Sequence, residues 1–359
     1  MSERRPVLLT VSGRIPDDLD EQVAAGSRPR ADYTVLAEAF NADLIDVDGA
    51  LRSTGLAGRL LHRAGGPGLL LGWYCFRRRR HYEVIVTDGE HVGLPLALLC
   101  RLLGCRRARH MMIAHILSTS SKARLIRNAR LGGLIDRYVV YCSSQRDFIV
   151  AELGVPSDRV MLSTFMVDTK FFAPDRVSVP QERMICSAGL ERRDYRTFLR
   201  AVDGLDVRVL FTAVSLWSKQ SDSSAGVALP SNAEVRKLTL FELREMYARS
   251  RFVVMPLENV EFQAGITTIL EAMAMGRAVI CTRAPGQTDT VVEGETGRYV
   301  TPGDAHELRE AIVDLLGDDR TSRLMGDTAR DWVVANADIE QYARRLAAQV
   351  ESLRAGVSV

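Results

Sequence analysis

The sequence predicts an α/β protein built from two doubly wound domains, each with a parallel sheet. Short apolar runs alternate with segments of helical periodicity along almost the whole chain, which is typical of parallel strands joined by helices. A length of 359 residues exceeds what one hydrophobic core usually supports and suits two domains. The alternation is interrupted at 171–182 by a polar segment that contains Pro and Asp, which we interpret as an interdomain linker.

Each predicted strand is an apolar run, and each predicted helix has apolar residues three and four positions apart. The strands of the first domain are predicted at 6–11, 43–47, 83–87, 110–115, 138–142 and 160–165. Those of the second domain are predicted at 184–188, 207–212, 252–256 and 278–282. Helices are predicted between them at 33–40, 95–103, 145–153, 195–202, 240–250 and 305–316, with a last helix at 339–353. The expected domains are therefore 1–175 and 176–338, followed by a terminal helical segment at 339–359.

The composition is that of a soluble globular protein, with 47% hydrophobic and 26% charged residues. The six cysteines have no C-x-x-C or metal-binding spacing and mostly lie in apolar runs, so we expect buried, reduced thiols. The longest apolar stretches, 68–76 and 92–100, are too short to span a bilayer. Because the chain starts without a signal peptide, we expect a cytoplasmic protein.

The net charge is only +2, but it is unevenly distributed. Residues 52–137 contain 16 Lys and Arg against 4 Asp and Glu, and these basic residues interleave with apolar ones. This pattern favours contact with an anionic membrane or an acidic ligand. The alternative is a solvated arginine surface in an arginine-rich protein. No nucleic-acid recognition motif or aromatic platform accompanies the charge, so nucleic acid is not an expected partner.

The segment around Gly265 predicts an anion-binding helix start. Gly265 separates a predicted strand from a helix that runs into the next strand, which makes a βαβ unit. A helix beginning here leaves the N–H groups of Ile266, Thr267 and Thr268 unpaired and suited to phosphate. Glu271 lies on the same helix face as Thr267, where a carboxylate suits the hydroxyls of a ribose. The alternative is a core helix with a partly exposed Glu.

These residues also carry a family resemblance. The spacing of Gln263 and Glu271 resembles the E-x7-E motif of retaining GT-B glycosyltransferases of family GT4, with Gln in place of the first Glu. The following EAMAMG-x-AVI stretch, the loop 285–289 and the segment 293–304 resemble the same family. The resemblance is specific over 251–317, fair over 137–250, and rests on layout over 1–136.

The resemblance implies a fold and an activity. The fold would be GT-B, with two Rossmann-like domains facing across a cleft and the C-terminal helix crossing back to the first domain. The protein would transfer a hexose-like sugar from a nucleoside-diphosphate sugar, expected to be a UDP-sugar, to the hydroxyl of a small-molecule or lipid-linked acceptor. Retention at the anomeric carbon, no cofactor and no catalytic metal are implied as well. The arginine excess over 52–137 leaves peripheral contact with the inner face of an anionic membrane open as well.

Several donor-binding residues follow from this resemblance. The loop after strand 184–188 carries Arg193 at the position of a family Lys that holds the donor diphosphate, and a guanidinium can grip two phosphate oxygens. The alternative for Arg193 is a surface ion pair. Leu190 stands where the family has an Arg, so Arg192 or Lys219 would compensate.

Two further positions would lie near the donor. Gln263 keeps a hydrogen-bond acceptor for the transferred sugar but lacks the family's charge, which Glu258 or Glu261 could supply. Gly13, after the first strand, takes the place of a glycine-rich loop near the donor phosphate. The neighbouring arginines Arg14, Arg28 and Arg30 could line the acceptor site or be loop charges.

Acceptor-side residues are predicted at two strand ends of the first domain. His115 ends one strand, and the resemblance implies that it orients the acceptor or relays its proton. A histidine satisfied within the structure is the alternative. Glu90 and His91 follow the preceding strand, next to Asp88, and we assign them to the acceptor side. Such close groups on one loop rarely make a metal site alone, so no metal is predicted.

Two other functions stay open. A nucleotide-sugar epimerase would share the fold and would turn over donor alone. A non-catalytic protein that binds a sugar nucleotide or a membrane surface is compatible with Gln at position 263. A NAD-dependent enzyme is disfavoured, because no predicted strand is followed by G-x-G-x-x-G. The base and sugar of the donor, the acceptor and the oligomeric state do not follow from the sequence.

Overall fold

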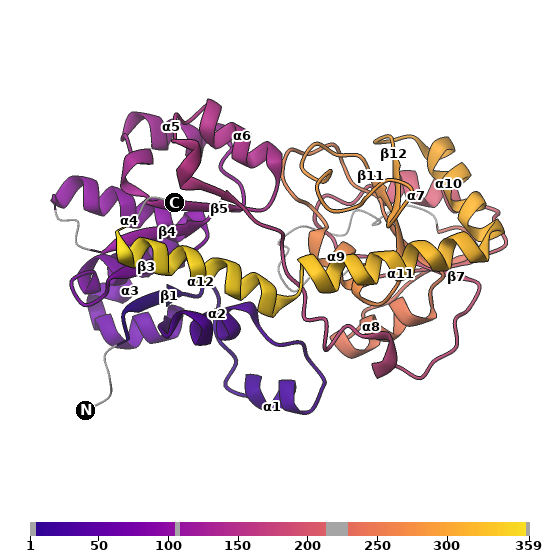
Figure 1. Cartoon of the computed structure of the whole chain (residues 1–359), viewed down its shortest axis with the longest axis horizontal. Helices are drawn as coiled ribbons and strands as arrows, with labels where there is room; N and C mark the ends of the chain where they lie inside the picture. The colour runs from indigo at the N-terminus through magenta and orange to yellow at the C-terminus, as the bar shows by residue number, and fades with distance from the viewer. Residues whose placement is uncertain (1–4, 105–107, 213–228, 357–359) are drawn as a thin grey trace. The chain divides into compact units, whose positions relative to one another are not determined.

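The computed structural model describes residues 5–104, 108–212 and 229–356. The chain divides into two compact units, coloured by residue number in Figure 1. The first comprises the described parts of 1–20, 31–163 and 342–359, and the second comprises 21–30 and 164–341. The division at 163 precedes the expected boundary at 175, because Phe171 and Phe172 of the predicted linker are buried in the core of the second unit.

The first unit contains a six-stranded parallel sheet. In chain order its strands are β1 (Val7–Thr10), β2 (Ala42–Ile45), β3 (Val84–Asp88), β4 (Arg109–Ile113), β5 (Arg137–Val140) and β6 (Val160–Leu162). Their order in the sheet is β2-β1-β3-β4-β5-β6, with Leu8 in register with Ile85. The chain adds β2 on one side of β1 and all later strands on the other side. The strand order therefore reverses between β1 and β3.

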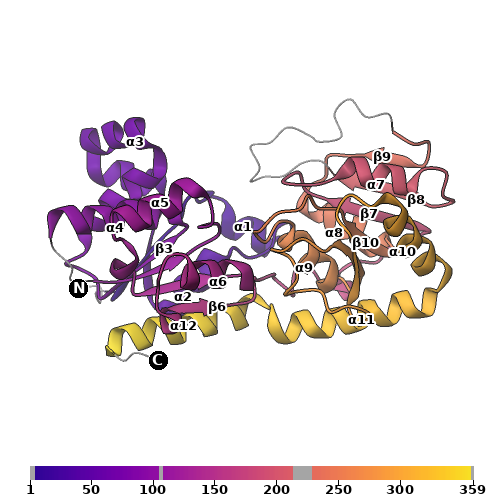
Figure 2. The same cartoon turned by 90° about the horizontal axis from the view of Figure 1, so that it is seen from above.

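Helices cover both faces of this sheet. They are α2 (Asp32–Phe40), α3 (Val47–Arg78), α4 (Glu90–Leu103), α5 (Ser120–Asn128), α6 (Ser143–Ala151) and, from Tyr342 onward, α12 (Ile339–Ala355). The short helix α1 (Leu19–Ala24) belongs to the second unit from Glu21 onward. Figure 2 shows α3, α4 and α5 on one side of the first sheet and α2 and α12 on the other. The α3 segment is broken by non-helical backbone at Gly55, Gly65 and Gly66, which explains why its periodicity did not predict a helix.

The second unit repeats the same design. Its strands are β7 (Met184–Ala188), β8 (Arg208–Thr212), β9 (Ala233–Val235), β10 (Phe252–Met255), β11 (Ala278–Thr282) and β12 (Gly297–Val300). They form a parallel sheet in the order β12-β11-β10-β7-β8-β9, so the strand order reverses between β7 and β10. The short strands β9 and β12 were not predicted, since three or four residues that include a Glu, an Arg or a Gly do not form an apolar run.

Two cores fill the second unit, one on each face of its sheet. On one face α7 (Tyr195–Val202) and α10 (Ala305–Gly317) pack against alternate strand residues such as Ile185 and Val254. On the other face α8 (Leu240–Arg249), α9 (Ile266–Ala274) and α11 (Asp319–Asn336) pack against the intervening residues, such as Cys186 and Val253. The fold class predicted from the alternation, two doubly wound parallel-sheet domains, is thus confirmed.

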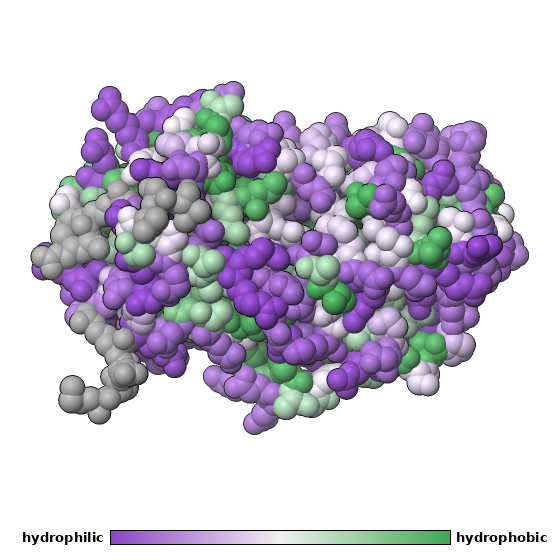
Figure 3. Space-filling model, viewed as in Figure 1, coloured by the Kyte–Doolittle hydropathy of each residue, from purple (hydrophilic) through white to green (hydrophobic). Residues whose placement is uncertain are grey.

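The last helix returns to the first unit, as the family resemblance implied. From Tyr342 onward α12 belongs to that unit. The hydroxyl of Tyr342 is hydrogen-bonded to the hydroxyl of Tyr141 at 2.7 Å, and Arg354 forms an ion pair with Glu83 at 2.7 Å. Hydrophilic residues dominate the face seen in Figure 3, with hydrophobic ones in small separate groups. Within the described ranges, no helix combines the length and the apolar character needed to cross a bilayer.

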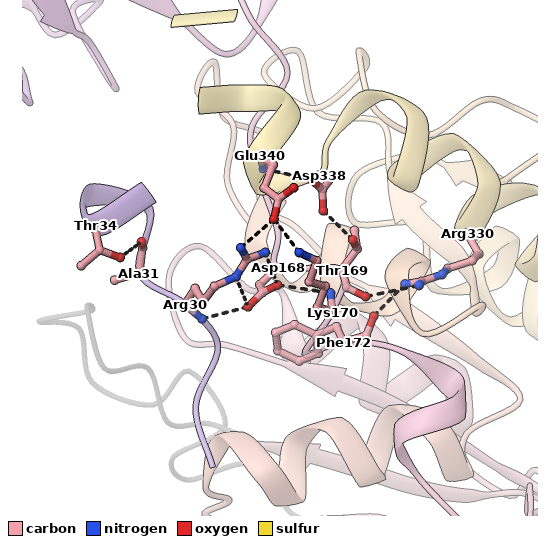
Figure 4. Close-up of polar contacts among 10 residues, drawn as sticks. All are labelled: Arg30, Ala31, Thr34, Asp168, Thr169, Lys170, Phe172, Arg330, Asp338 and Glu340. Carbon is pink, nitrogen blue, oxygen red and sulfur yellow. Dashed lines mark hydrogen bonds and ion pairs between the residues drawn. The ribbon is translucent and has the colours of Figure 1, made fainter. Parts of the chain in front are cut away.

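An ion-pair cluster around Arg30 joins three segments of the second unit. Figure 4 shows the Arg30 guanidinium between Asp168 and Glu340. Its Nη2 lies 3.0 Å from Oδ1 of Asp168, and its Nη1 lies 2.8 Å from Oε1 of Glu340, which also accepts from Lys170 at 2.6 Å. The Asp168 side chain is only 4% exposed. Arg30 was considered above as an acceptor-site residue or a loop charge. Its guanidinium instead forms ion pairs that connect the segments where the chain enters and leaves the second unit.

Replacing Arg30 should destabilise the second unit. Arg30→Met removes the guanidinium from the buried Asp168 carboxylate, and breaking a buried pair in this way costs about 3 kcal/mol. Amide hydrogen exchange of β7 and β10 would measure this loss as a lower free energy of opening. Arg14→Met is the matched control, because the Arg14 side chain is 76% exposed in its pair with Asp48 and should change little. Equal exchange in both variants would contradict a structural role for the cluster.

Candidate functional site

The carboxyl ends of β7 and β10 mark the candidate site of the second unit. In doubly wound sheets ligands bind beyond the carboxyl ends of the strands, where the strand order reverses. Here the loop after β7 contains Arg193 and Asp194, and the loop after β10 leads to Gly265. The two loops are joined by backbone contacts, because Arg193 forms a β-bridge with Leu257 and the N–H of Asp194 donates to Pro256 at 3.0 Å.

The start of α9 has the backbone that the sequence predicts. Gly265 precedes the helix with φ of 77°, a left-handed conformation that favours glycine. A Cβ at this position would lie 2.8 Å from the sulfur of Met255, so a larger residue does not fit. The helix begins at Ile266, and Thr267 is exposed on its first turn while Thr268 is buried. The backbone N–H groups of this first turn can therefore bind an anion.

Glu271 is buried one turn further along α9. Its side chain accepts a hydrogen bond from the hydroxyl of Tyr247 on α8 at 2.9 Å. Burial raises the pKa of Glu271 to about 8, and the bond from Tyr247 opposes this shift without cancelling it. The carboxyl group is thus protonated near neutral pH, and ligand hydroxyls that donate to it would favour ionisation. Tyr247 was not predicted, because on the sequence it is indistinguishable from any other core aromatic of an amphipathic helix.

Arg193 is more deeply held than the sequence suggested. The residue is 5% exposed, its Nε donates to the carbonyl of Ala188 at 2.9 Å, and its Nη1 donates to the carbonyl of Glu191 at 2.6 Å. Gly189 makes room for it, because a Cβ there would lie 2.4 Å from Nη2 of the guanidinium. Burial lowers the pKa of Arg193. Because the side chain is buried, the alternative of a surface ion pair is wrong, and the predicted phosphate contact stays a prediction.

Arg192 and Lys219 were the other basic residues considered for the donor phosphate. Arg192 is half-exposed and has φ of 55°, and its Nη1 forms an ion pair with Glu258 at 3.1 Å. This pair joins the loops after β7 and β10 and engages one of the two carboxylates considered as substitutes near Gln263. The other, Glu261, is exposed. Lys219 lies outside the described residues.

Two glutamines near the start of α9 have carbonyl oxygens without partners. The Gln263 amide nitrogen donates weakly to Thr290 at 3.3 Å, and the Gln287 amide nitrogen donates to the carbonyl of Ala264 at 2.7 Å. The Oε1 atoms of both glutamines are buried and accept no hydrogen bond from the protein. Buried acceptors of this kind are costly unless a donor satisfies them. A bound molecule with hydroxyl groups would supply such donors. Gln287 lies in the motif loop 285–289 but was not singled out.

A second polar cluster lies at the carboxyl ends of β3 and β4 in the first unit, beside the reversal in strand order. His115 follows β4, and its Nε2 lies 3.6 Å from Oδ1 of Asp88 at the end of β3. Its side chain is 44% exposed, and its ring centroid lies 5.7 Å from that of Tyr141. Desolvation acts against protonation, but the Asp88 carboxylate outweighs it and raises the pKa of His115. Asp32, at the start of α2, was not predicted; burial and the charge of Asp88 raise its pKa to about 6.

The other predicted residues of the first unit have different surroundings. Glu90 is buried and accepts hydrogen bonds from the backbone N–H of His115 at 3.0 Å and from Lys122 at 2.7 Å. His91 is exposed at the start of α4. Gly13 has open space where a Cβ would be, so packing does not require a glycine there. Across the described residues, no three His, Cys, Asp or Glu side chains are grouped to hold a metal ion.

Comparison with known proteins places this site in a family context. Residues 183–318 match the model of the family described as glycosyl transferases group 1. The chain is 28% identical over 208 residues to a GDP-mannose-dependent alpha-(1-6)-phosphatidylinositol monomannoside mannosyltransferase of Mycolicibacterium smegmatis, covering 50% of this chain and 53% of that protein. It is 35% identical over 113 residues to a sulfoquinovosyl transferase of Arabidopsis thaliana, covering 28% and 22%. The alignment thus spans about half the length of the first of these relatives and less of the second.

Solved structures share the fold over nearly the whole chain. A sucrose-phosphate synthase from Thermosynechococcus elongatus superposes with a TM-score of 0.72 at 16% identity, covering 98% of this chain and 100% of that one. The Anabaena protein HepE, solved in complex with UDP and glucose, superposes with a TM-score of 0.70 at 14% identity, covering 97% and 100%. Both are GT-B structures, so this fold is confirmed for the chain.

The raised pKa of Glu271 predicts how stability depends on pH. The folded state holds this proton up to about pH 8, whereas an unfolded Glu releases it near 4.3. Folding is therefore favoured below the unfolded pKa, and this contribution is lost as pH rises toward 8, by up to about 1.4 kcal/mol per pH unit. Denaturation of the ligand-free protein between pH 5 and 8.5 should show a shallower decline in Glu271→Gln. Identical slopes in both proteins would mean that Glu271 is ionised throughout.

Proposed function

We propose that this chain transfers a hexose-like sugar from a nucleoside-diphosphate sugar to an acceptor hydroxyl with retention of configuration, because residues 183–318 match the family model of group 1 glycosyl transferases. The observation that carries the proposal is the arrangement at the end of β10. A helix start suited to phosphate, a buried carboxyl one turn later and two unpaired carboxamide oxygens belong to one turn-and-helix segment and its neighbouring loop.

The diphosphate, the ribose and the transferred sugar of the donor would each contact a different group of the site. The amides of Ile266, Thr267 and Thr268 would hold the diphosphate at the helix start. Glu271 would accept hydrogen bonds from the ribose hydroxyls and ionise as they bind. The carbonyl oxygens of Gln263 and Gln287 lack donors in the protein and are closed off from solvent, so each side chain would turn on binding to accept from hydroxyls of the transferred sugar.

The chemistry would be electrostatic. As the bond from the anomeric carbon to the leaving oxygen breaks, negative charge grows on the diphosphate, and fixed backbone N–H groups stabilise it without reorganisation. The acceptor oxygen would bond to the anomeric carbon on the same face, and its proton would pass to the leaving phosphate. Arg193 would add positive charge from beneath the loop after β7. In the first unit His115 and Asp88 would orient the acceptor.

We also propose peripheral contact of the first unit with an anionic membrane. Leu56 and Leu60 are 77% and 69% exposed, although both are large and apolar. With Arg59 and Arg63, also exposed, they share one face of the α3 segment that follows Gly55, at helical spacings of three and four. Apolar side chains flanked by arginines on one helix face suit the boundary between acyl chains and anionic headgroups.

The arginines at 77–80 offer positive charge but have no exposed apolar side chain beside them along this described part of the chain. Arg77, Arg78 and Arg79 lie over the rings of Trp73, Tyr74 and Phe76 at 5.9, 5.7 and 3.7 Å. These cation–π contacts tie the arginines to the end of α3. The helix face with Leu56 and Leu60 is therefore the preferred contact surface.

Glu271→Gln tests the donor site. Losing hydrogen bonds to a charged group costs roughly 1.5–3 kcal/mol, so the dissociation constant of the donor should rise about 10- to 150-fold. Thermal shift with UDP-, GDP-, ADP- and dTDP-sugars would identify the donor first, since a ligand of the folded state raises Tm. One relative is named for GDP-mannose and one neighbour was solved with UDP.

Glu310→Gln, on the far face of the second unit at 65% exposure, is the matched control and should bind donor normally. Wild-type affinity should also increase as pH rises toward 8, because the ionised form of Glu271 is the one that binds. The proposal fails if none of the four donors raises Tm. Turnover of donor without any acceptor would indicate an epimerase instead.

The membrane contact is tested by a double variant. Leu56→Ser with Leu60→Ser should reduce sedimentation with anionic phosphatidylglycerol vesicles, because both apolar anchors are lost. Binding of the wild type should weaken as salt rises, since each arginine near an anionic surface contributes on the order of 1 kcal/mol. Leu324→Ser, with a side chain 64% exposed on α11, is the control. Wild-type protein that stays in the supernatant at low salt would rule out the contact.

A further inference from the structure

The segment between β4 and α5 is held from two sides by buried polar groups. It carries His115 and Ile116 and belongs to no helix or strand. On one side Glu90, the first residue of α4, accepts from the N–H of His115 at 3.0 Å through Oε2. On the other side the amide of Gln145, a residue 2% exposed, accepts from the N–H of Leu117 at 2.9 Å.

Lys122 completes the hold on His115. Its ammonium group donates to Oε1 of Glu90 at 2.7 Å and to the carbonyl of Ile116 at 2.9 Å. The Glu90–Lys122 pair is therefore hydrogen-bonded to the backbone at two successive residues, the N–H group of His115 and the carbonyl group of Ile116. This fixes the backbone that carries the imidazole, and the ring faces Asp88 at 3.6 Å as a result.

Burying the Glu90–Lys122 ion pair costs desolvation free energy, so the pair adds little to the stability of the fold. The Glu90 side chain is 7% exposed and that of Lys122 is 32% exposed. Burial alone would raise the pKa of Glu90, but Lys122 outweighs it and lowers the pKa, so the carboxylate stays ionised. Apolar residues of similar volume often stabilise a protein as well as a buried ion pair does. What the pair supplies here is a defined geometry at His115.

We propose that Glu90 and Lys122 are positioning residues for the reaction proposed above: they hold His115 against Asp88, with its imidazole directed at the acceptor hydroxyl. The inference rests on the proposed transfer function. It assigns no acceptor contact to Glu90 itself, whose two oxygens are both occupied within the protein. Asp88 orients the ring, and the ring is the group that meets the acceptor.

Several charged or titratable groups face His115 from the surrounding elements. The test therefore has to distinguish a change in the His115 pKa caused by their charge from one caused by movement of the ring. These groups are Asp32 on α2, Asp88 at the end of β3, Glu90 and His91 on α4, Lys122 on α5 and Tyr141 after β5, whose hydroxyl is bonded to that of Tyr342 on α12. Neutralising Glu90 would lower the pKa of His115 through charge alone. Neutralising Lys122 removes a positive charge, which through charge alone would raise it.

The decisive variant is therefore Lys122→Met. If the pair positions His115, losing Lys122 frees the segment, the ring leaves Asp88, and the pKa of His115 falls by about one unit despite the lost positive charge. NMR titration of histidine-labelled protein would measure this pKa, with His115→Asn to assign the resonance. Lys122→Ala, which also removes both contacts of the ammonium group, serves the same purpose if the methionine variant does not fold. A rise or no change in the His115 pKa in the folded variant would overturn the proposal.

Asp136→Asn is a matched control at the opposite end of the same strand. Asp136 accepts from the N–H of His110 at 2.8 Å and from Arg109 at 3.1 Å, which repeats the arrangement of Glu90 with His115 and Lys122. It should lower Tm without changing the pKa of His115. Once a donor is known, Lys122→Met should lower kcat about tenfold with an unchanged KM for the donor, and Asp136→Asn should leave kcat unchanged. A loss of kcat in both variants would also overturn the proposal.

The two proposals fail separately. The NMR titration needs neither donor nor acceptor, so it tests positioning even in a protein without activity. If no nucleotide sugar binds but the His115 pKa falls as expected, the transfer function is wrong and the hold on His115 stands. If transfer occurs but the pKa does not fall, the function stands and the Glu90–Lys122 pair has no positioning role.

Discussion

The parallel direction of the strands is the constraint on which the rest of this structure depends. Parallel strands need crossover connections, so a crossover begins at the edge where the preceding strand has ended. In each sheet the carboxyl ends of six strands therefore share one edge, and the reversal of strand order separates two neighbouring loops at that edge. Asp88 and His115 reach it in the first unit, and Arg193 and Gly265 reach it in the second.

Both edges contain ionisable groups that are buried and held by the protein itself. Glu271 has the hydroxyl of Tyr247, Arg193 has two backbone carbonyls, and Glu90 has Lys122 and the N–H of His115. Burial makes the charged form of each group costly, so the partners decide which form persists. Glu90 stays ionised because a cation faces it, whereas Glu271 faces only a hydroxyl and takes up a proton. The same residue type thus has opposite protonation behaviour in the two units.

Sequence similarity and structural similarity are distributed differently over the chain. The family match covers 183–318, within the second unit, while solved structures at 16% identity superpose over 98% of the chain. The second unit contains the backbone features that need particular residues, such as Gly265 before α9 and Gly189 beside Arg193. The first unit has such positions too, since a Cβ at Gly93 would lie 2.4 Å from the sulfur of Met112. Most of its sheet, however, follows from an alternation of apolar strands and amphipathic helices that many sequences satisfy.

The sequence by itself determined the elements whose cause is local. All ten predicted strands are present, because each is a short apolar run between turn residues, and the start of α9 follows from Gly265 and the periodicity after it. Only the tertiary structure decided which side chains meet. Tyr247 and Glu271 lie on different helices, Lys122 reaches Glu90 across the sheet edge, and Asp168 finds Arg30 from 138 residues away. The inward turn of Arg193 and the burial of Phe171 in the predicted linker have the same origin. Contacts and burial of this kind depend on how helices pack over a sheet, and no short stretch of sequence encodes that packing.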